Sequence, residues 1–90
     1  MPRASYVNGR YLPHLEAKVH IEDRGFQFAD GVYEVIGVFW GCLIDVEEHL
    51  DRLERSLSEL RMAPPLGRTS LQLVMLETLR RNHVKNGKIF

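Results

Sequence analysis

The chain has 90 residues, and its 12 lysines and arginines balance 12 aspartates and glutamates, so the formal net charge is zero. Zero net charge argues against a nucleic-acid partner or an anionic membrane surface, because both require excess positive charge. No stretch reaches the roughly 20 apolar residues of a membrane span, and nothing near Met1 resembles a signal peptide. Cys42 is the single cysteine, which excludes an internal disulfide. We therefore expect one small domain from a reducing, cytoplasmic compartment.

The first part of the chain is predicted to be extended. Asn8-Gly9 is the dipeptide that a type I′ turn favours, and apolar and aromatic residues flank it on both sides, which indicates a hairpin. Farther on, Asp23-Arg24-Gly25 is typical of a turn in which Asp23 caps the local backbone and Arg24 ties segments together. The FQFADG stretch after it predicts a short helical turn.

Residues 32–40, VYEVIGVFW, predict a strand because they are rich in β-branched and aromatic side chains, and Gly41 allows a turn into a second hairpin. Alternate side chains of a strand face opposite ways, so Tyr33 and Val35 share one face, with Gly37 leaving room beside them. They either line a small-molecule pocket or belong to a core strand, and the pattern alone favours the core. A carboxylate at Glu34 must be at an edge, paired or functional.

Two helices follow, near residues 46–61 and 69–85. Apolar residues recur at helical spacing in each segment, and Asp45 with Glu48 predicts a capping box before the first helix. Residues 88–90 resemble the opening of another strand, so we expect the chain to be a fragment. The elements together predict an α+β fold, with a mainly antiparallel sheet and two helices packed on one face of it.

Arg52 on the first helix has two interpretations. Glu48 lies four residues before it, so a surface ion pair is the simpler one, and the spacing alone favours it. Alternatively, Arg52 grips an anion, and His49 one turn away suits a phosphate. The four histidines of the chain are scattered without the spacing of a metal site, so we expect no metal.

Taken together, DRGFQFADGVYEV and EEHLDRLERS resemble the fold-type IV pyridoxal-phosphate enzymes, over nearly the whole chain. The family includes D-amino acid aminotransferases, branched-chain aminotransferases and aminodeoxychorismate lyase. The ADGVYEV stretch is most similar to the D-amino acid aminotransferases, although alanine stands here for the first glycine of their GDGVYEV.

The resemblance assigns roles to three residues. Tyr33 matches a tyrosine that helps to hold the substrate carboxylate, and Val35 matches a wall of the substrate pocket. Arg52 matches the arginine that grips the phosphate of pyridoxal 5′-phosphate, which reverses the preference for an ion pair with Glu48. Glu34 has a matching glutamate, for which only a supporting role is expected.

The resemblance also implies that residues 1–90 form an incomplete N-terminal small domain. The lysine that forms the Schiff base with the cofactor is expected beyond Phe90, so the chain alone holds no catalytic residue and should be inactive. The whole protein is expected to be a homodimer that moves an amino group between a D-amino acid, such as D-alanine, and a 2-oxo acid. The alternatives are aminodeoxychorismate lyase, a branched-chain aminotransferase or, if the protein ends at Phe90, a non-catalytic binding module.

Overall fold

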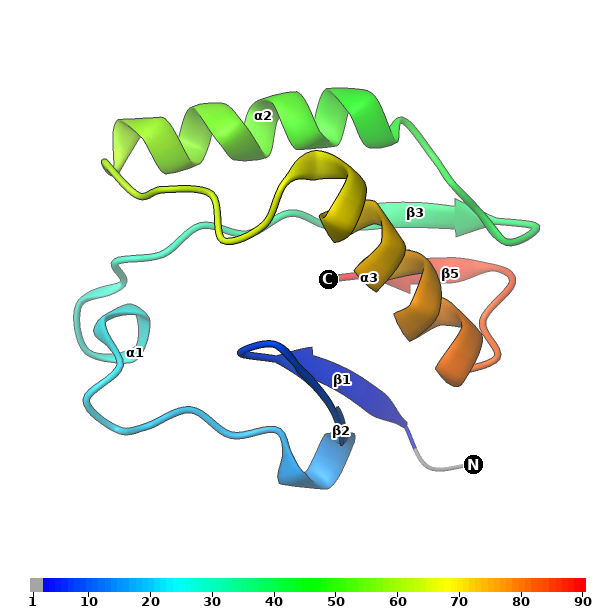
Figure 1. Cartoon of the computed structure of the whole chain (residues 1–90), viewed down its shortest axis with the longest axis horizontal. Coiled ribbons are helices and arrows are strands. Elements are labelled where there is room, and N and C mark those ends of the chain that lie inside the picture. Colours follow the sequence, from blue (N-terminus) through cyan, green and yellow to red (C-terminus); the bar gives the residue numbers. More distant parts are fainter. Residues whose placement is uncertain (1–2) are drawn as a thin grey trace.

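The structure is a computed structural model that describes residues 3–90 (Figure 1). Its strands are β1 (Ala4–Val7), β2 (Arg10–Pro13), β3 (Ile36–Phe39), β4 (Cys42–Leu43) and β5 (Gly87–Ile89). Its helices are the short η1 (His14–Glu16) and α1 (Arg24–Phe28) and the longer α2 (Val46–Glu59) and α3 (Arg68–Arg81). Within the described residues the strands pair antiparallel throughout, as a β1–β2 hairpin and a sheet of order β4-β3-β5. The predicted α+β class is therefore confirmed.

Both predicted hairpins are present. Asn8 and Gly9 have φ angles of 51° and 87°, the left-handed backbone that a type I′ turn requires, and Val7 pairs with Arg10 across it. Trp40 and Gly41, at φ 50° and 76°, make a similar turn between β3 and β4. The turn therefore lies where the dipeptide Asn8-Gly9 predicts it.

Strand β3 is shorter than predicted, because it begins at Ile36 instead of residue 32. The antiparallel register pairs Ile36 with Ile89, and residues 32–35 pair with no strand among the described residues. The predicted alternation nevertheless holds within β3, because Ile36 and Val38 are buried and Phe39 is exposed. The side-chain pattern of residues 32–40 predicts an extended segment, and the strand assigned within it is the part that pairs with β4 and β5.

Helices α2 and α3 build the core against β3 and β5. Ile36, Leu50 and Met75 form the buried cluster, and partly buried apolar side chains of β4, β5 and both helices surround it: Leu43, Val46, Leu53, Leu71 and Ile89. Figure 1 shows α2 running along β3, while α3 crosses near β5. The predicted apolar stripes of the two helices are thus confirmed as their buried faces.

The predicted capping box at the start of α2 is wrong. Asp45 has a left-handed backbone, with φ 54° and ψ 38°, and its side chain makes no capping hydrogen bond. A side-chain cap depends on an extended backbone at the capping residue, and Asp45 instead turns the chain from β4 into the helix. Its carbonyl still accepts a hydrogen bond from the His49 amide at 3.0 Å.

Helix α3 ends at Arg81, four residues before the predicted end, and Asn82 fastens this end to the first strand. The Asn82 amide donates to the Ala4 carbonyl at 3.0 Å, and its oxygen accepts from the Ala4 amide at 2.8 Å. The same side chain donates to the Thr78 carbonyl at 2.7 Å. The side-chain amide of Asn82 therefore provides a donor for a carbonyl at the end of α3 and also joins two residues, Ala4 and Asn82, that lie 78 positions apart.

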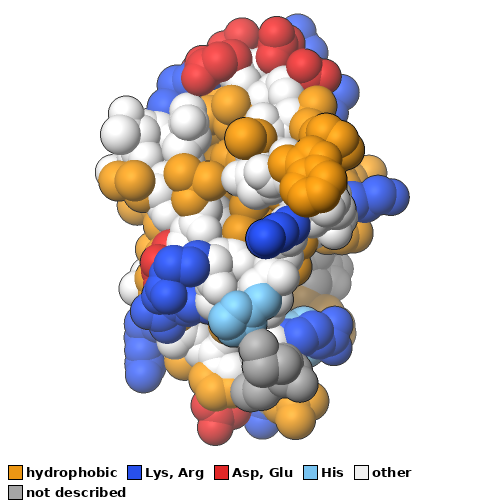
Figure 2. Space-filling model, turned by 90° about the vertical axis from the view of Figure 1, so that its right-hand side faces the viewer, with side chains coloured by type: hydrophobic (Ala, Val, Ile, Leu, Met, Phe, Trp, Pro, Cys, Tyr) orange, Lys and Arg blue, Asp and Glu red, His pale blue; other side chains and the backbone are white. Residues whose placement is uncertain are grey.

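The segment between the two sheets carries α1 and leaves much apolar surface exposed. Asp23 accepts from the Gly25 amide at 3.0 Å and Arg24 donates to Asp30 at 2.9 Å, which confirms the predicted turn. Exposed large apolar side chains include Phe26 and Phe28 here and Phe39 and Trp40 on the β3–β4 hairpin. Figure 2 faces the side with that hairpin and the end of α3, where hydrophobic side chains lie between charged ones. Among residues 3–90 no helix is long and apolar enough to cross a membrane.

Candidate functional site

Glu34 lies in residues 32–35, the extended stretch before β3 that is called the strand segment below, and it is the centre of a polar cluster that joins this segment to α2. Its Oε1 accepts from His49 Nδ1 at 2.7 Å and from one Arg52 Nη at 2.8 Å, and its Oε2 accepts from Arg52 Nε at 2.8 Å. The Glu34 side chain is 10% exposed and that of His49 is 21% exposed, whereas that of Arg52 is 56% exposed. A nearly buried carboxylate is thus satisfied by two donors from one face of a helix.

The two basic partners keep Glu34 ionised. The Arg52 guanidinium, with a smaller contribution from His49, lowers the pKa of Glu34 to about 2, against burial, which acts in the opposite direction. An ionised carboxylate only accepts hydrogen bonds, so His49 must carry a proton on Nδ1. The 3.4 Å approach of the Arg52 Nη to the same Nδ1 is then a contact between two donors, not a hydrogen bond.

Arg52 leans inward toward the strand segment and not along its own helix. The predicted surface partner, Glu48, makes no ion pair or side-chain hydrogen bond with it in the structure of residues 3–90. Glu34 occupies the edge of the guanidinium formed by Nε and one Nη nitrogen. The second Nη nitrogen has no hydrogen-bond partner in the described part of the chain, so one edge of the fork remains able to bind an anion.

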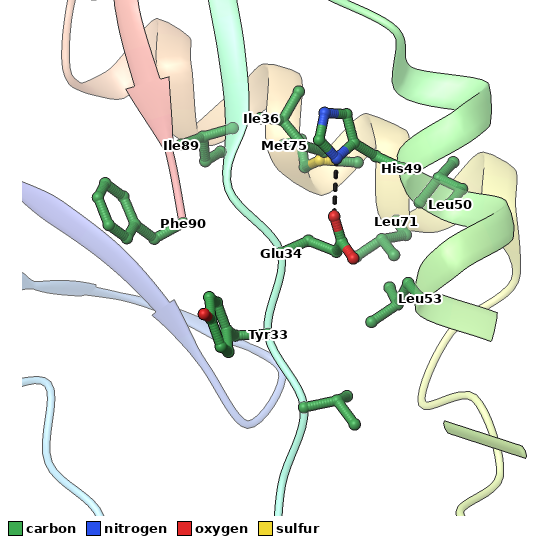
Figure 3. Close-up of a pocket in the computed structure, with 11 residues that line it drawn as sticks. Tyr33, Glu34, Ile36, His49, Leu50, Leu53, Leu71, Met75, Ile89 and Phe90 are labelled. Carbon is green, nitrogen blue, oxygen red and sulfur yellow. Dashed lines mark hydrogen bonds and ion pairs between the residues drawn. The ribbon is translucent and has the colours of Figure 1, made fainter. Parts of the chain in front are cut away.

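Tyr33 lies on the other side of the backbone from Glu34. Figure 3 shows Glu34 pointing toward His49 on α2 and the Tyr33 ring pointing away, on the side of Phe90. Tyr33 is 84% exposed, and its phenol makes no hydrogen bond within the described chain. The core-strand interpretation, in which the tyrosine finds a backbone partner, does not describe this residue.

Val35 follows the predicted alternation in sequence, but the expected space beside it is partly filled. It is half-buried and lines none of the described cavities. A Cβ built on Gly37 would lie 3.4 Å from Ile44 Cδ1, so Ile44 covers the room predicted next to Gly37. The absence of a side chain at residue 37 therefore makes room for Ile44, and it opens no pocket among the described residues.

A cavity of about 310 Å³ lies between the strand segment and the two long helices (Figure 3). Apolar side chains of β3, α2, α3 and β5 form most of its wall: Ile36, Leu50, Leu53, Leu71, Met75 and Ile89. Glu34 and His49 supply the polar groups on the α2 side, and Tyr33 also lines the cavity. An apolar cavity with a few convergent polar groups is the usual form of a small-molecule site.

The outer side of Arg52 borders a second hollow, of about 350 Å³, which is more acidic. Asp45, Glu48 and Asp51 line it together with Arg52 and Arg55. Three carboxylates against two guanidinium groups do not favour an anion held in this hollow alone. Within the described residues no group of three or more histidine, cysteine or carboxylate side chains could hold a metal ion.

Sequence reasoning did not predict the contact between Glu34 and Arg52. The two residues are 18 positions apart, and helical spacing pointed to Glu48. One signal was present, because a carboxylate in a strand of otherwise apolar residues demands a partner. The sequence predicted that Glu34 is at an edge, paired or functional, and the structure shows it paired, with His49 and Arg52.

Comparison with known proteins identifies the class of protein that these features resemble. No family model matches the chain. The structure matches that of a branched-chain aminotransferase from Thermoproteus uzoniensis with a TM-score of 0.84 and 25% identity, over 98% of this chain and 31% of that one. The chain therefore has the fold of part of an aminotransferase, which confirms the resemblance to the fold-type IV enzymes.

Several curated proteins that are similar to the chain are D-alanine aminotransferases. The chain is 42% identical over 87 residues to that of Staphylococcus haemolyticus and 37% identical over 83 residues to that of Bacillus licheniformis. These matches cover 94% and 92% of this chain, but 30% and 29% of the relatives. The chain thus spans less than a third of the length of the curated relatives it matches.

Proposed function

We propose that residues 1–90 are the N-terminal small domain of a longer pyridoxal-phosphate-dependent aminotransferase, which moves an amino group between a D-amino acid, such as D-alanine, and a 2-oxo acid. The observation that carries the proposal is the 42% identity to a D-alanine aminotransferase over 94% of this chain. The opposed directions of Tyr33 and Glu34 support it, because they leave a phenol free for substrate while the carboxylate holds Arg52.

The residues of this chain fit the phosphate group of the cofactor. Arg52 is half exposed and keeps one guanidinium edge without a partner among residues 3–90, and such an edge can form charge-assisted hydrogen bonds to a dianion. Since Glu34 offsets the Arg52 charge and carboxylates line the outer hollow, the rest of the whole protein must supply further phosphate donors. Bound pyridoxal phosphate would supply an electron sink for the charge left when the α-proton of the substrate is removed.

Tyr33 and Val35 take the substrate side of the proposed site. The free phenol of Tyr33 can donate a hydrogen bond to the substrate carboxylate, and Val35 gives an apolar wall for a small side chain. The lysine that binds the cofactor covalently is proposed to lie beyond Phe90, so the 90-residue chain alone should not catalyse transamination. Proton transfer at the α-carbon then belongs to residues outside this chain, and the proposed roles of Tyr33 and Arg52 are to bind and to orient.

A structural likeness to a branched-chain aminotransferase makes the transfer of amino groups from branched-chain amino acids the second candidate function. The whole protein, loaded with pyridoxal phosphate, would be given D-alanine, L-alanine or L-leucine in turn, each with 2-oxoglutarate. Glutamate formed from D-alanine but not from the two L-amino acids supports the proposal. Turnover of L-leucine in place of D-alanine contradicts it and favours the second candidate.

The role of Arg52 is tested by titrating the apo form of the whole protein with pyridoxal phosphate. Arg52→Ala should weaken binding about 10- to 100-fold, since charge-assisted hydrogen bonds contribute about 1.5–3 kcal/mol. Arg55→Ala is the matched control, because Arg55 lies on the same helix and the same hollow. If Arg52→Ala and Arg55→Ala bind pyridoxal phosphate with equal affinity, the phosphate role of Arg52 is wrong, and its role is that of a structural ion-pair partner of Glu34.

A further inference from the structure

We propose that Glu34 is a positioning residue for Arg52, which fixes the guanidinium so that its unused edge meets the cofactor phosphate. This inference rests on the proposed function, because it assumes that Arg52 binds that phosphate. It assigns a purpose to a carboxylate that contacts neither cofactor nor substrate in the proposed function. The alternative role is structural, in which Arg52 and His49 merely neutralise a carboxylate that the fold has buried.

The geometry of the Glu34–Arg52 pair restricts how the guanidinium can point. Two parallel hydrogen bonds of 2.8 Å, from Nε and from one Nη, hold the planar group at two points along one edge. A single contact would leave the plane free to rotate, whereas two contacts fix its orientation. The second Nη then necessarily lies on the side away from Glu34, which defines the edge open to an anion.

Glu34 itself is held firmly enough to act as a fixed point. It lies two residues before Ile36, which is buried in the core, and His49 donates to its Oε1 at 2.7 Å (Figure 3). His49 comes from the same helix as Arg52, one turn earlier, so the helix contacts the carboxylate through both side chains. The carboxylate is thus anchored by the strand segment on one side and by the imidazole on the other.

Arg52 gains from such an anchor because it is otherwise a long, half-exposed side chain. An arginine side chain has many rotamers, and phosphate binding would have to overcome the loss of that conformational entropy if the side chain were free. An existing contact to Glu34 removes part of that cost before the ligand arrives. The same carboxylate also opposes the ligand, since its negative charge lies near the proposed phosphate position.

These two effects predict opposite results in a double-mutant cycle. If positioning dominates, Arg52 contributes less to phosphate binding once Glu34 is removed, because the guanidinium is no longer held. If charge neutralisation dominates, Arg52 contributes more once Glu34 is removed, because its full charge becomes available. The sign of the coupling between the two residues therefore distinguishes positioning from neutralisation.

The experiment measures pyridoxal phosphate affinity of the apo whole protein in four forms: wild type, Arg52→Ala, Glu34→Gln and the double variant. Glu34→Gln keeps the volume but replaces one acceptor oxygen by an NH₂ donor, so it cannot accept the two parallel hydrogen bonds of the guanidinium on separate oxygens. We expect Arg52→Ala to lower the affinity for pyridoxal phosphate about 10-fold or more in the wild-type background and less than about 3-fold in the Glu34→Gln background. Pyridoxal, which lacks the phosphate, is the matched ligand, and its affinity should be unaffected by either substitution.

The outcomes separate this inference from the function on which it rests. An equal or larger cost of Arg52→Ala in the Glu34→Gln background overturns the positioning role of Glu34 while leaving phosphate binding by Arg52 intact. No cost of Arg52→Ala in the wild-type background overturns the phosphate role itself. A merely structural role for Glu34 would weaken pyridoxal and pyridoxal phosphate binding equally, which also contradicts the proposal.

Discussion

Acidification should release the cluster around Glu34, and the size of the effect follows from the structure. The pKa of Glu34 is about 2 in the fold, against an ordinary value of 4.5. A carboxyl whose pKa is lowered by folding stabilises the fold above its unfolded pKa and loses that contribution as the pH falls toward the folded value. The stabilisation is therefore complete at neutral pH and disappears between about pH 5 and pH 2.

The magnitude is bounded by the difference between the two pKa values. A difference of about 2.5 pH units at about 1.36 kcal/mol each gives roughly 3 kcal/mol. Arg52 is 56% exposed, and solvent screens its charge, so we expect about 2 kcal/mol in practice. Most of this contribution, about 1.5 kcal/mol, should be lost by about pH 3.

The assay is urea unfolding of the 90-residue chain, followed by far-ultraviolet circular dichroism, for wild type and Glu34→Gln. The wild type should be more stable by about 2 kcal/mol near pH 7, and the gap should shrink below about 1 kcal/mol near pH 3. Glu59→Gln is the control, because Glu59 is exposed and has no ion pair or side-chain hydrogen bond in the structure of residues 3–90. A gap for Glu34→Gln that does not change with pH would refute the lowered pKa.

The remaining predictions concern substrate binding, assembly and the fold. Tyr33→Phe in the whole protein should lower kcat/KM for amino-acid substrates about 10-fold while pyridoxal phosphate affinity stays unchanged, and wild-type kinetics would remove Tyr33 from the site. Sedimentation of the whole protein should show a homodimer, against which a stable monomer at micromolar concentration would count. Asn82→Ala should reduce the free energy of unfolding by about 1–3 kcal/mol, because the Ala4 amide and carbonyl lose their partner; chemical denaturation measures this loss, and unchanged stability would show that water replaces Asn82.

Local chemistry made much of the fold predictable. The Asn8-Gly9 turn needs two residues with positive φ, and that demand is met by those two residues alone. The apolar stripes of α2 and α3 likewise depend on spacing within one helix, and they correctly gave the buried faces. Features that depend on one segment only were therefore the ones that the sequence predicted well.

Features that depend on two distant segments were not predictable in the same way. The pairing of β3 with β5 joins segments far apart in the sequence, and the partner of Arg52 depends on how residues 32–35 pass α2. The capping role of Asp45 failed for a related reason, because the turn out of β4 imposes a left-handed backbone on it. Helical spacing predicted Glu48 as the ion-pair partner of Arg52, because it compares only residues of the same helix. Glu34 lies outside that helix.

The alternation of Tyr33 and Glu34 connects the predicted site to the observed one. Extended backbone sends successive side chains to opposite sides, so a carboxylate that faces α2 obliges its neighbour to face away from that helix. Glu34 must face α2 because only there does it find His49 and Arg52, without which a nearly buried charge would be costly. The contact between Glu34 and Arg52 therefore also sets the direction of Tyr33. One peptide bond, between Tyr33 and Glu34, links the proposed phosphate-binding and substrate-carboxylate-binding groups. Loss of the Glu34 contact should on this reasoning disturb both ends of the proposed site, although Glu34 touches neither ligand.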